Sequence, residues 1–292
     1  MNSWVRLLRP GNGAISFVGT VVGGLSATGL LEGRLGTEIG PLLLAGLTTF
    51  LVASGGNVLN DYLDREGDRK NHPDRPLPRG EVAAESVRAF AAGLFLLSGV
   101  PLLGVFLWGK APTGLAGEAM PVGVWLAAVL LLLAYELRWK PRGLLGNATV
   151  AALTGAVFLF GATIVGAPLL AVSLAAMASL ATLSREIIKD MEDAEGDVDR
   201  HTLPRDRGMA VASLAARGAV VAAIALSPIP LVLWRPPLPV PAAIIYLTFV
   251  AAADLVFVLS VRTLPKELHR EQSLSKLAMV LALVGFLGAA LR

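Results

Sequence analysis

Long runs without a charged residue dominate the first half of the chain. An α-helix rises 1.5 Å per residue, so about 20 apolar residues cross the roughly 30 Å of hydrocarbon in a bilayer. The first four charge-free runs have nearly this length, and they cover residues 14–31, 41–59, 89–109 and 119–135. They predict four membrane-spanning helices.

The next charge-free run is too long for one crossing. It covers residues 143–184, which is 42 residues without a charge. As a single helix it would extend about 63 Å, twice the thickness of the hydrocarbon core. Gly166, Ala167 and Pro168 form a turn signal near its middle, so the run predicts two helices with a turn at that point.

Three further apolar runs follow a polar connection. They are residues 209–234, interrupted by Arg217, residues 237–261, which contain Asp254, and the shorter run 277–291. An ionisable group such as Asp254 is costly in hydrocarbon, so it is expected to face a cavity, reach the nearby membrane surface or pair with a neighbouring helix. The total is nine spans, and they predict a single all-α domain, residues 1–292, that forms a polytopic membrane bundle around a central cavity.

The basic residues support this count and orient the chain. Nine spans with a cytoplasmic N-terminus leave 21 of the 25 lysines and arginines in or beside cytoplasmic segments, and only Arg34, Lys110, Arg235 and Arg292 outside. Positive charge collects on the cytoplasmic side of membrane proteins, and a wrong number of spans would scatter it. The acidic residues gather on the same side, so any chemistry is expected at the cytoplasmic face of the cell membrane.

Composition removes several other classes of protein. The hydrophobic share of 54% is too high for a soluble domain, and the chain has no cysteine. Disulfides and thiolate metal sites are therefore excluded, and a metal ion would need oxygen or imidazole ligands. The net charge is only +3, and no soluble basic domain is present to bind nucleic acid. Nothing in the sequence indicates an obligatory protein partner.

Carboxylates crowd the end of the second predicted span. Asp61, Asp64 and Asp68 recur at positions i, i+3 and i+7, which fall within about 60° of one another around a helix. Asn57 lies one turn earlier on the same face, and Asn60 directly precedes the first aspartate. Three carboxylates are thus expected to project from one helix face.

The same spacing returns at the end of the sixth span. Asp190, Asp193 and Asp197 repeat the first set after a shift of 129 positions, and a Leu-Pro-Arg sequence follows each set. One acidic run alone could be a solvated loop with capping residues. The repetition at equivalent helix ends instead indicates an internal repeat with a shared purpose.

Six aspartates at two helix ends repel one another unless a cation is shared between them. Oxygen ligands without cysteine or spaced histidine suit Mg²⁺, which keeps several waters and completes its shell with substrate phosphates. The six aspartates are therefore the candidate catalytic and metal-binding residues, and two clusters that face each other could bind a diphosphate through Mg²⁺.

Some basic residues near these clusters are candidates for contact with phosphate oxygens. Most of the other basic residues are explained by the general excess of lysine and arginine on the cytoplasmic side of membrane proteins. Lys140 follows the fourth span, Arg185 and Lys189 precede the second cluster, and Arg75 and Arg79 lie in a proline-rich loop that could close over the site.

The acidic segments resemble the two aspartate-rich motifs of the UbiA superfamily of intramembrane prenyltransferases. Tyr135 with Lys140 looks like the Tyr-x-x-x-x-Lys element between those motifs, and nine helices with motifs after the second and sixth is the layout of that family. Residues 60–80 and 185–197 are more narrowly similar to the archaeal digeranylgeranylglyceryl phosphate synthases. By resemblance, Asn57, Asn60, Tyr135 and the basic candidates are expected to bind substrate.

The resemblance implies a Mg²⁺-dependent transfer of a geranylgeranyl group from its diphosphate to geranylgeranylglyceryl phosphate in archaeal ether-lipid synthesis. Its expected partners are these two lipid substrates and the surrounding membrane lipids. One alternative within the family is an aromatic acceptor, as in quinone pathways. An alternative from another class is a cation-coupled transporter, although transporter sites are expected near the bilayer midplane rather than at helix ends.

Overall fold

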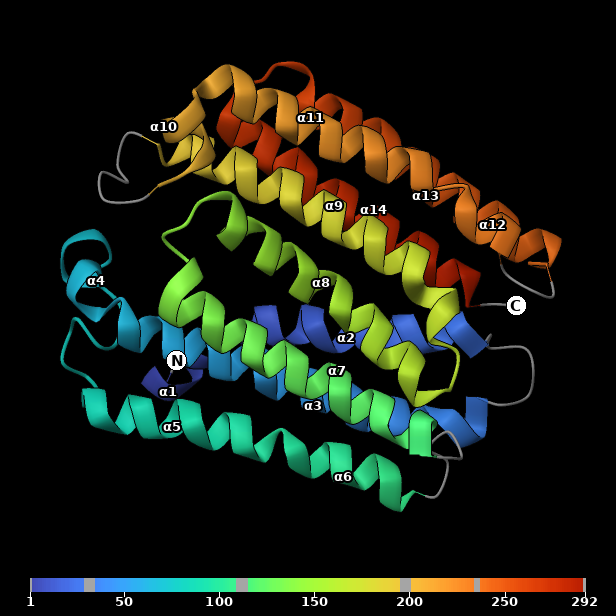
Figure 1. Ribbon diagram of the computed structural model, residues 1–292, viewed down its shortest axis with the longest axis horizontal. Helices are drawn as coiled ribbons and strands as arrows, with labels where there is room; N and C mark the ends of the chain where they lie inside the picture. The colour runs from blue at the N-terminus through green and yellow to red at the C-terminus, as the bar shows by residue number, and fades with distance from the viewer. Residues whose placement is uncertain (1, 29–34, 109–114, 195–200, 234–236, 291–292) are drawn as a thin grey trace.

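The protein is a bundle of long helices laid side by side (Figure 1). The computed structural model describes residues 2–28, 35–108, 115–194, 201–233 and 237–290, and within these ranges it contains helices and turns but no strand. In hydrocarbon every backbone N–H and C=O group needs a partner within the protein, and a helix supplies these partners inside one segment. The all-α prediction is confirmed.

The first half of the chain builds one side of the bundle. Its helices are α1 (Ser3–Leu8), α2 (Pro10–Thr28), α3 (Leu35–Leu63), α4 (Arg65–Asn71), α5 (Ala84–Leu97), α6 (Gly99–Leu107), α7 (Leu115–Ala134), the π-helical turn η1 (Tyr135–Trp139) and α8 (Leu144–Ile164). The second half contains α9 (Pro168–Glu192), α10 (Leu203–Arg207), α11 (Met209–Leu226), α12 (Ile229–Leu233), α13 (Val240–Arg262) and α14 (Leu268–Ala289).

Eight helical stretches in the described part of the chain are long and apolar enough to cross a membrane. They correspond to the second to ninth predicted spans, and the protein is therefore a multi-pass membrane protein. The helix at the first predicted span, α2, has 19 residues and is not among the eight. The count of nine and the cytoplasmic N-terminus stay predictions.

The turn predicted inside the long apolar run is confirmed. Helix α8 ends at Ile164 and α9 begins at Pro168. Gly166 adopts a φ of +74°, a conformation that costs glycine little, and Pro168 stands at the first turn of α9, where a missing N–H is harmless.

Helix α2 lies in the middle of the bundle, where it packs against α3, α8, α9 and α14. Its contact with α8 is made by backbone atoms. A Cβ atom added to Gly161 would stand 1.9 Å from the Thr20 oxygen, and one added to Gly23 would stand 2.3 Å from the Phe158 oxygen. Small residues at such crossings let two helices approach closely in a membrane. Packing of this kind accounts for the many small residues in α2.

Two ionisable residues inside predicted spans have partners on neighbouring segments. Arg217 on α11 donates hydrogen bonds to the carbonyl oxygens of Val261, at 3.1 Å, and Leu264, at 2.9 Å. Asp254 on α13 accepts a hydrogen bond of 2.8 Å from Ser227, the residue that follows α11. Of the arrangements considered for Asp254, pairing with a neighbouring helix is the one observed.

One end of the bundle contains the residues that the sequence predicts to be functional. Helix α3 leads into α4 at this end, η1 leads into α8, and α9 ends beside α10, at the left in Figure 1. We call it the acidic end, because residues 61–68 and 190–193 lie there. Both acidic segments thus lie at the same end of the helices.

Candidate active site

The first acidic segment spans the junction between two helices. Asp61 belongs to α3, Asp68 belongs to α4, and Asp64 stands between them with φ −83° and ψ 0°. The backbone hydrogen bonds of a helix continue through the junction, from Asp64 N to Asn60 O and from Asp68 N to Asp64 O, both at 2.9 Å. The helical register predicted for the three aspartates is therefore nearly preserved, although α3 itself ends at Leu63.

The three aspartates differ in burial and in partners. Asp61 is 4% exposed and Asp68 is 5% exposed, whereas the side chain of Asp64 is 37% exposed. A nitrogen of Arg75 lies 2.5 Å from Asp68 Oδ2 and 3.5 Å from Asp61 Oδ1. One guanidinium therefore brings the two buried carboxylates together, and Asp64 turns to other partners.

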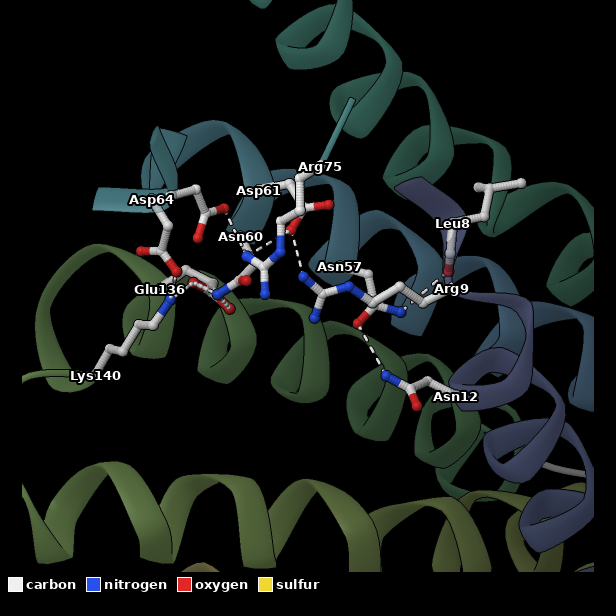
Figure 2. Close-up of polar contacts among 11 residues, drawn as sticks. Leu8, Arg9, Asn12, Asn57, Asn60, Asp61, Asp64, Arg75, Glu136 and Lys140 are labelled. Atoms are coloured by element: carbon white, nitrogen blue, oxygen red, sulfur yellow. Dashed lines mark hydrogen bonds and ion pairs between the residues drawn. The ribbon is translucent and has the colours of Figure 1, made fainter. Parts of the chain in front are cut away.

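Arg9 supplies a second cation to Asp61, and the sequence offered little signal for it. Its guanidinium donates to Asp61 Oδ1 (Figure 2). Arg9 follows α1 with a φ of +46°, so the chain turns sharply there before α2 begins. Its position ahead of the first apolar run suggested only a topological role, because the contact joins residues 52 positions apart.

The π-helical turn η1 completes the first cluster from the opposite side. Lys140, directly after η1, donates to Asp64 Oδ2, and its ammonium lies 3.5 Å from Glu136 Oε2 (Figure 2). Asn60 donates to both oxygens of Glu136, at 3.3 and 3.1 Å. The predicted residues Asn60, Asp64 and Lys140 thus form one network, and its fourth member, Glu136, was not predicted.

Three other predicted residues of this region contact neighbouring segments. Asn57 donates to the carbonyl oxygen of Leu8 at 3.1 Å and accepts from Asn12 at 3.4 Å, so it fastens the N-terminal segment to α3. Arg79 pairs with Glu81 at 3.1 Å and is half exposed. Tyr135 opens η1, and its ring lies against the start of α8 at Gly146.

The second acidic segment ends helix α9. Asp190 is buried, and its Oδ2 accepts a hydrogen bond of 2.7 Å from Asn147 on α8. Asp193 caps the end of α9 and is exposed. Asp197 lies outside the described residues. No local pattern singled out Asn147, because an asparagine in an apolar helix has no local signature of its partner.

The basic candidates of the second segment lie on α9. Arg185 pairs with its neighbour Glu186 at 2.5 Å, and Lys189 is exposed. A lysine in the last turn of a helix also stabilises the helix dipole. Both side chains stand within two turns of Asp190, at the acidic end.

Residues 135–147 bridge the two acidic segments. Lys140 in this stretch contacts the first segment, and Asn147 contacts the second. Between them the Pro141 oxygen accepts a hydrogen bond of 3.2 Å from the backbone N–H of His201, just after the second segment. Gly143 passes so close to His201 that an added Cβ atom would stand 2.3 Å from its carbonyl oxygen. The element predicted to lie between the motifs therefore joins them in space.

In the described part of the chain, no three histidine or acidic side chains converge as a ready metal site. The chemistry of the donors nevertheless fits Mg²⁺. Two buried carboxylates, Asp61 and Asp68, already share one positive charge from Arg75, and Asp64 shares another from Lys140. Such hard oxygen donors are the ligands that Mg²⁺ selects.

Comparison with known proteins gives consistent similarities. Residues 17–284 match the model of the UbiA prenyltransferase family. The chain is 35% identical over 299 residues to the digeranylgeranylglyceryl phosphate synthase of Methanopyrus kandleri, with 100% of both chains covered. It is 39% identical over 238 residues to the synthase of the same name from Halobacterium salinarum, covering 77% of this chain and 76% of that protein.

Solved structures show the same architecture. A structure described as a digeranylgeranylglyceryl phosphate synthase in membranes matches with a TM-score of 0.77 at 29% identity, covering 99% of this chain and 98% of the other. A UbiA homologue from Archaeoglobus fulgidus, bound to DMAPP and Mg²⁺, matches with a TM-score of 0.65 at 14% identity, covering 98% and 99%. At that identity the second match supports the fold alone.

Proposed function

Because this chain belongs to the UbiA prenyltransferase family, we propose that it transfers a geranylgeranyl group from geranylgeranyl diphosphate to the free hydroxyl of geranylgeranylglyceryl phosphate. The product is digeranylgeranylglyceryl phosphate, an intermediate of archaeal ether lipids. Relatives of that name, similar along the full length of the chain, support the choice of substrates. Residues 1–292 act as one domain in this proposal, and the reaction takes place at the cytoplasmic face of the cell membrane.

The charged network at the acidic end is the main support for this function. Buried carboxylates and cations alternate at the end of a membrane bundle, with Arg75 between Asp61 and Asp68 and with Lys140 at Asp64. Isolated charges are costly in a membrane, so a network of this size is retained for a charged substrate. An isoprenyl diphosphate has its charge at one end and its apolar chain at the other. It therefore matches a bundle with charged residues at one end and apolar helices beside them.

The aspartates of the two segments would hold Mg²⁺. The ligand set is Asp61, Asp64, Asp68, Asp190 and Asp193, and it extends to Asp197 by the repeat in the sequence. When bound, Mg²⁺ neutralises charge on the leaving diphosphate.

The basic residues bind the donor and stabilise the leaving group. Arg75 and Lys140 are already oriented by carboxylates, and Arg185 and Lys189 lie on the last turns of α9. The bond between the allylic carbon and the diphosphate oxygen breaks with its electron pair on oxygen, and these cations stabilise the developing charge. The acceptor hydroxyl then forms the new C–O bond and loses its proton.

The remaining contacts orient the donor and protect it. Asn60 and Tyr135 bind donor groups, Asn57 holds the N-terminal segment in place, and Arg79 belongs to the loop that covers the site. Water must be kept from an allylic carbocation, which is a reason for this cover. The tail of twenty carbons lies among the apolar helices, where burial contributes about 0.8 kcal/mol per CH₂-sized unit.

The test is a transfer assay with purified protein in detergent. Geranylgeranyl diphosphate is offered with geranylgeranylglyceryl phosphate or with a hydroxybenzoate, with and without Mg²⁺, and products are identified by mass. We expect the diether product and release of diphosphate only with the glycerol acceptor and Mg²⁺. A prenylated hydroxybenzoate would move the enzyme to a quinone pathway, and no diphosphate release with any acceptor would favour a transporter.

A further inference from the structure

Glu136 is an unexpected group at the proposed diphosphate site. Its side chain is 5% exposed, and it lies beside Lys140, which is expected to bind phosphate oxygens. A buried carboxylate repels a diphosphate, so its presence there weakens substrate binding unless it does something else. Glu136 belongs to neither acidic segment and is not one of the proposed Mg²⁺ ligands.

The contacts of Glu136 connect two residues of the proposed donor site. Both of its oxygens accept hydrogen bonds from the Asn60 amide, at 3.3 and 3.1 Å. One of them also lies 3.5 Å from the ammonium of Lys140, which in turn donates to Asp64. Figure 2 shows Glu136 between Asn60 and Lys140, with Asp64 on the far side of the ammonium.

The backbone around Glu136 is arranged for these contacts. Residues 135–139 form a π-helical turn, closed by the hydrogen bond of 2.9 Å from Lys140 N to Tyr135 O. Such a turn inserts one extra residue into a helix and is frequent at functional sites. Here Glu136 and Lys140 both reach the side of η1 that faces α3.

We propose that Glu136 is a positioning residue, whose buried carboxylate holds the Asn60 amide and the Lys140 ammonium in the places where the donor diphosphate meets them. This proposal rests on one part of the function proposed above, namely that the site binds a diphosphate. Without the carboxylate, a lysine with four rotatable bonds would be attracted to Asp64 or to any phosphate oxygen in reach. With it, the orientation of Lys140 is fixed before the substrate arrives, which favours the transition state over simple binding.

This role predicts an unusual pair of changes in Glu136→Gln. Glutamine has the same shape and keeps an acceptor oxygen for Asn60, but the negative charge is lost. Because one repulsive charge is removed and Lys140 is released, inorganic diphosphate with Mg²⁺ should bind about threefold to tenfold more tightly. Turnover should fall about tenfold or more, because Lys140 is no longer held in its catalytic position.

The experiment measures both quantities on purified protein in detergent. Calorimetric titration with Mg²⁺ and inorganic diphosphate gives the affinity, and prenyl transfer gives kcat. Glu85→Gln is the matched control: Glu85 is 71% exposed on α5 and pairs with Arg88 across one helical turn, so both quantities should match the wild type. Weaker diphosphate binding together with lower kcat in Glu136→Gln, or no change in either, would overturn the proposal.

A double-mutant cycle tests whether Glu136 acts through Lys140. In Lys140→Ala, the further change Glu136→Gln should alter kcat by less than about twofold, since the group it positions is already absent. If the two substitutions lower kcat by factors that multiply, Glu136 acts independently of Lys140.

If the Glu136→Gln protein does not accumulate, Glu136→Asp replaces it. Aspartate keeps the negative charge but has a shorter side chain, so turnover should fall while the diphosphate affinity stays within about twofold of wild type. Tighter diphosphate binding by Glu136→Asp would contradict the positioning role of Glu136.

The outcome also separates this proposal from the proposed function. A wild-type protein that binds Mg²⁺ and diphosphate but prenylates no glycerol acceptor contradicts the acceptor assignment only. The affinity change in Glu136→Gln then still decides the role of Glu136. A wild-type protein that binds no diphosphate would remove both proposals.

Discussion

Asp61 and Asp64 are three positions apart in one motif, yet they stand in different environments. Asp61 is buried and receives two guanidinium groups, from Arg9 and Arg75, whereas Asp64 is partly exposed and pairs with Lys140. Removing one member of a buried, charged network leaves its partners without compensation, which costs much more than removing an exposed charge. The two aspartates should therefore respond differently to substitution.

Asp64→Ala should abolish transfer and leave the protein folded, because a partly exposed pair contributes less than about 1 kcal/mol. Asp61→Asn should also abolish transfer but lower the free energy of unfolding by about 2 kcal/mol or more. Thermal unfolding in detergent and the transfer assay measure the two effects. Glu66→Ala on α4 is the control, since Glu66 is exposed and forms its ion pairs with the neighbouring Arg65 and Arg69. Full activity of Asp64→Ala would disprove the metal-binding assignment.

At the scale of elements, the short helix α1 decides where Arg9 stands. The hydroxyl of Ser3 donates to Glu81 Oε2 at 2.6 Å, and Arg6 donates to the Asp74 carbonyl and lies 3.5 Å from Glu81. These contacts dock α1 on the loop of residues 72–83, so the chain can turn at Arg9 and aim its guanidinium at Asp61.

The docking of α1 should weaken in acid. The hydrogen bond from Ser3, helped by Arg79 and Arg6, lowers the pKa of the Glu81 carboxyl below its usual range. A carboxyl with a lowered pKa contributes stability above its unfolded pKa, and the contribution is lost as pH falls through the folded value. The rate of amide hydrogen exchange in α1, relative to the intrinsic rate at the same pH, should therefore rise as the pH falls through the acidic range below about 4.5. Glu81→Gln should show fast exchange at every pH; an unchanged acid response in this variant would assign the effect to another group.

The crossing of α2 and α8 depends on glycine. In Gly161→Ala the new methyl group would collide with the Thr20 carbonyl, so the two helices must separate. Loss of a backbone contact of this kind should lower the unfolding free energy by about 2 kcal/mol or more, as measured by thermal unfolding in detergent. Gly218→Ala on α11 is the matched control, because nothing lies within 4 Å of its added Cβ atom. Equal stability of the two variants would mean that the helices are not in close contact there.

At the scale of the whole molecule, the acidic end is balanced by the protein's own cations. Arg9, Arg75 and Lys140 neutralise the first acidic segment without a metal ion, and Asn147 contacts the second. We therefore expect the fold to be independent of the ion that the proposed reaction requires. This arrangement differs from small metalloproteins, in which metal binding supplies the folding energy.

Removal of Mg²⁺ with a chelator should abolish transfer but change the midpoint of thermal unfolding by only a few degrees, about 3 °C or less. Activity should return when Mg²⁺ is added back. Parallel assays of transfer and of thermal unfolding on one preparation measure both. Unfolding of the protein on chelation would mean that the metal is structural and that the internal cations do not suffice.

Local patterns in the amino-acid sequence predicted most of the helices and both acidic segments. Hydrophobic run length fixed eight spans, and a glycine and proline signal fixed the turn between α8 and α9. These features depend on residues close together in the chain, so a local pattern contains them. The duplicated aspartate spacing likewise identified both acidic segments, which lie at the same end of the bundle.

The partners of the aspartates became visible only in the folded protein. Arg9, Glu136 and Asn147 stand 43 to 76 positions from their partners, and each looked like an ordinary loop or helix residue in the sequence. Asn57 donates to the Leu8 carbonyl and Arg79 pairs with Glu81, contacts that the sequence did not predict, and their binding of substrate stays a prediction. Contacts of this kind depend on how helices pack and where a π-helical turn rotates a side chain, and neither property is encoded in a local run of residues.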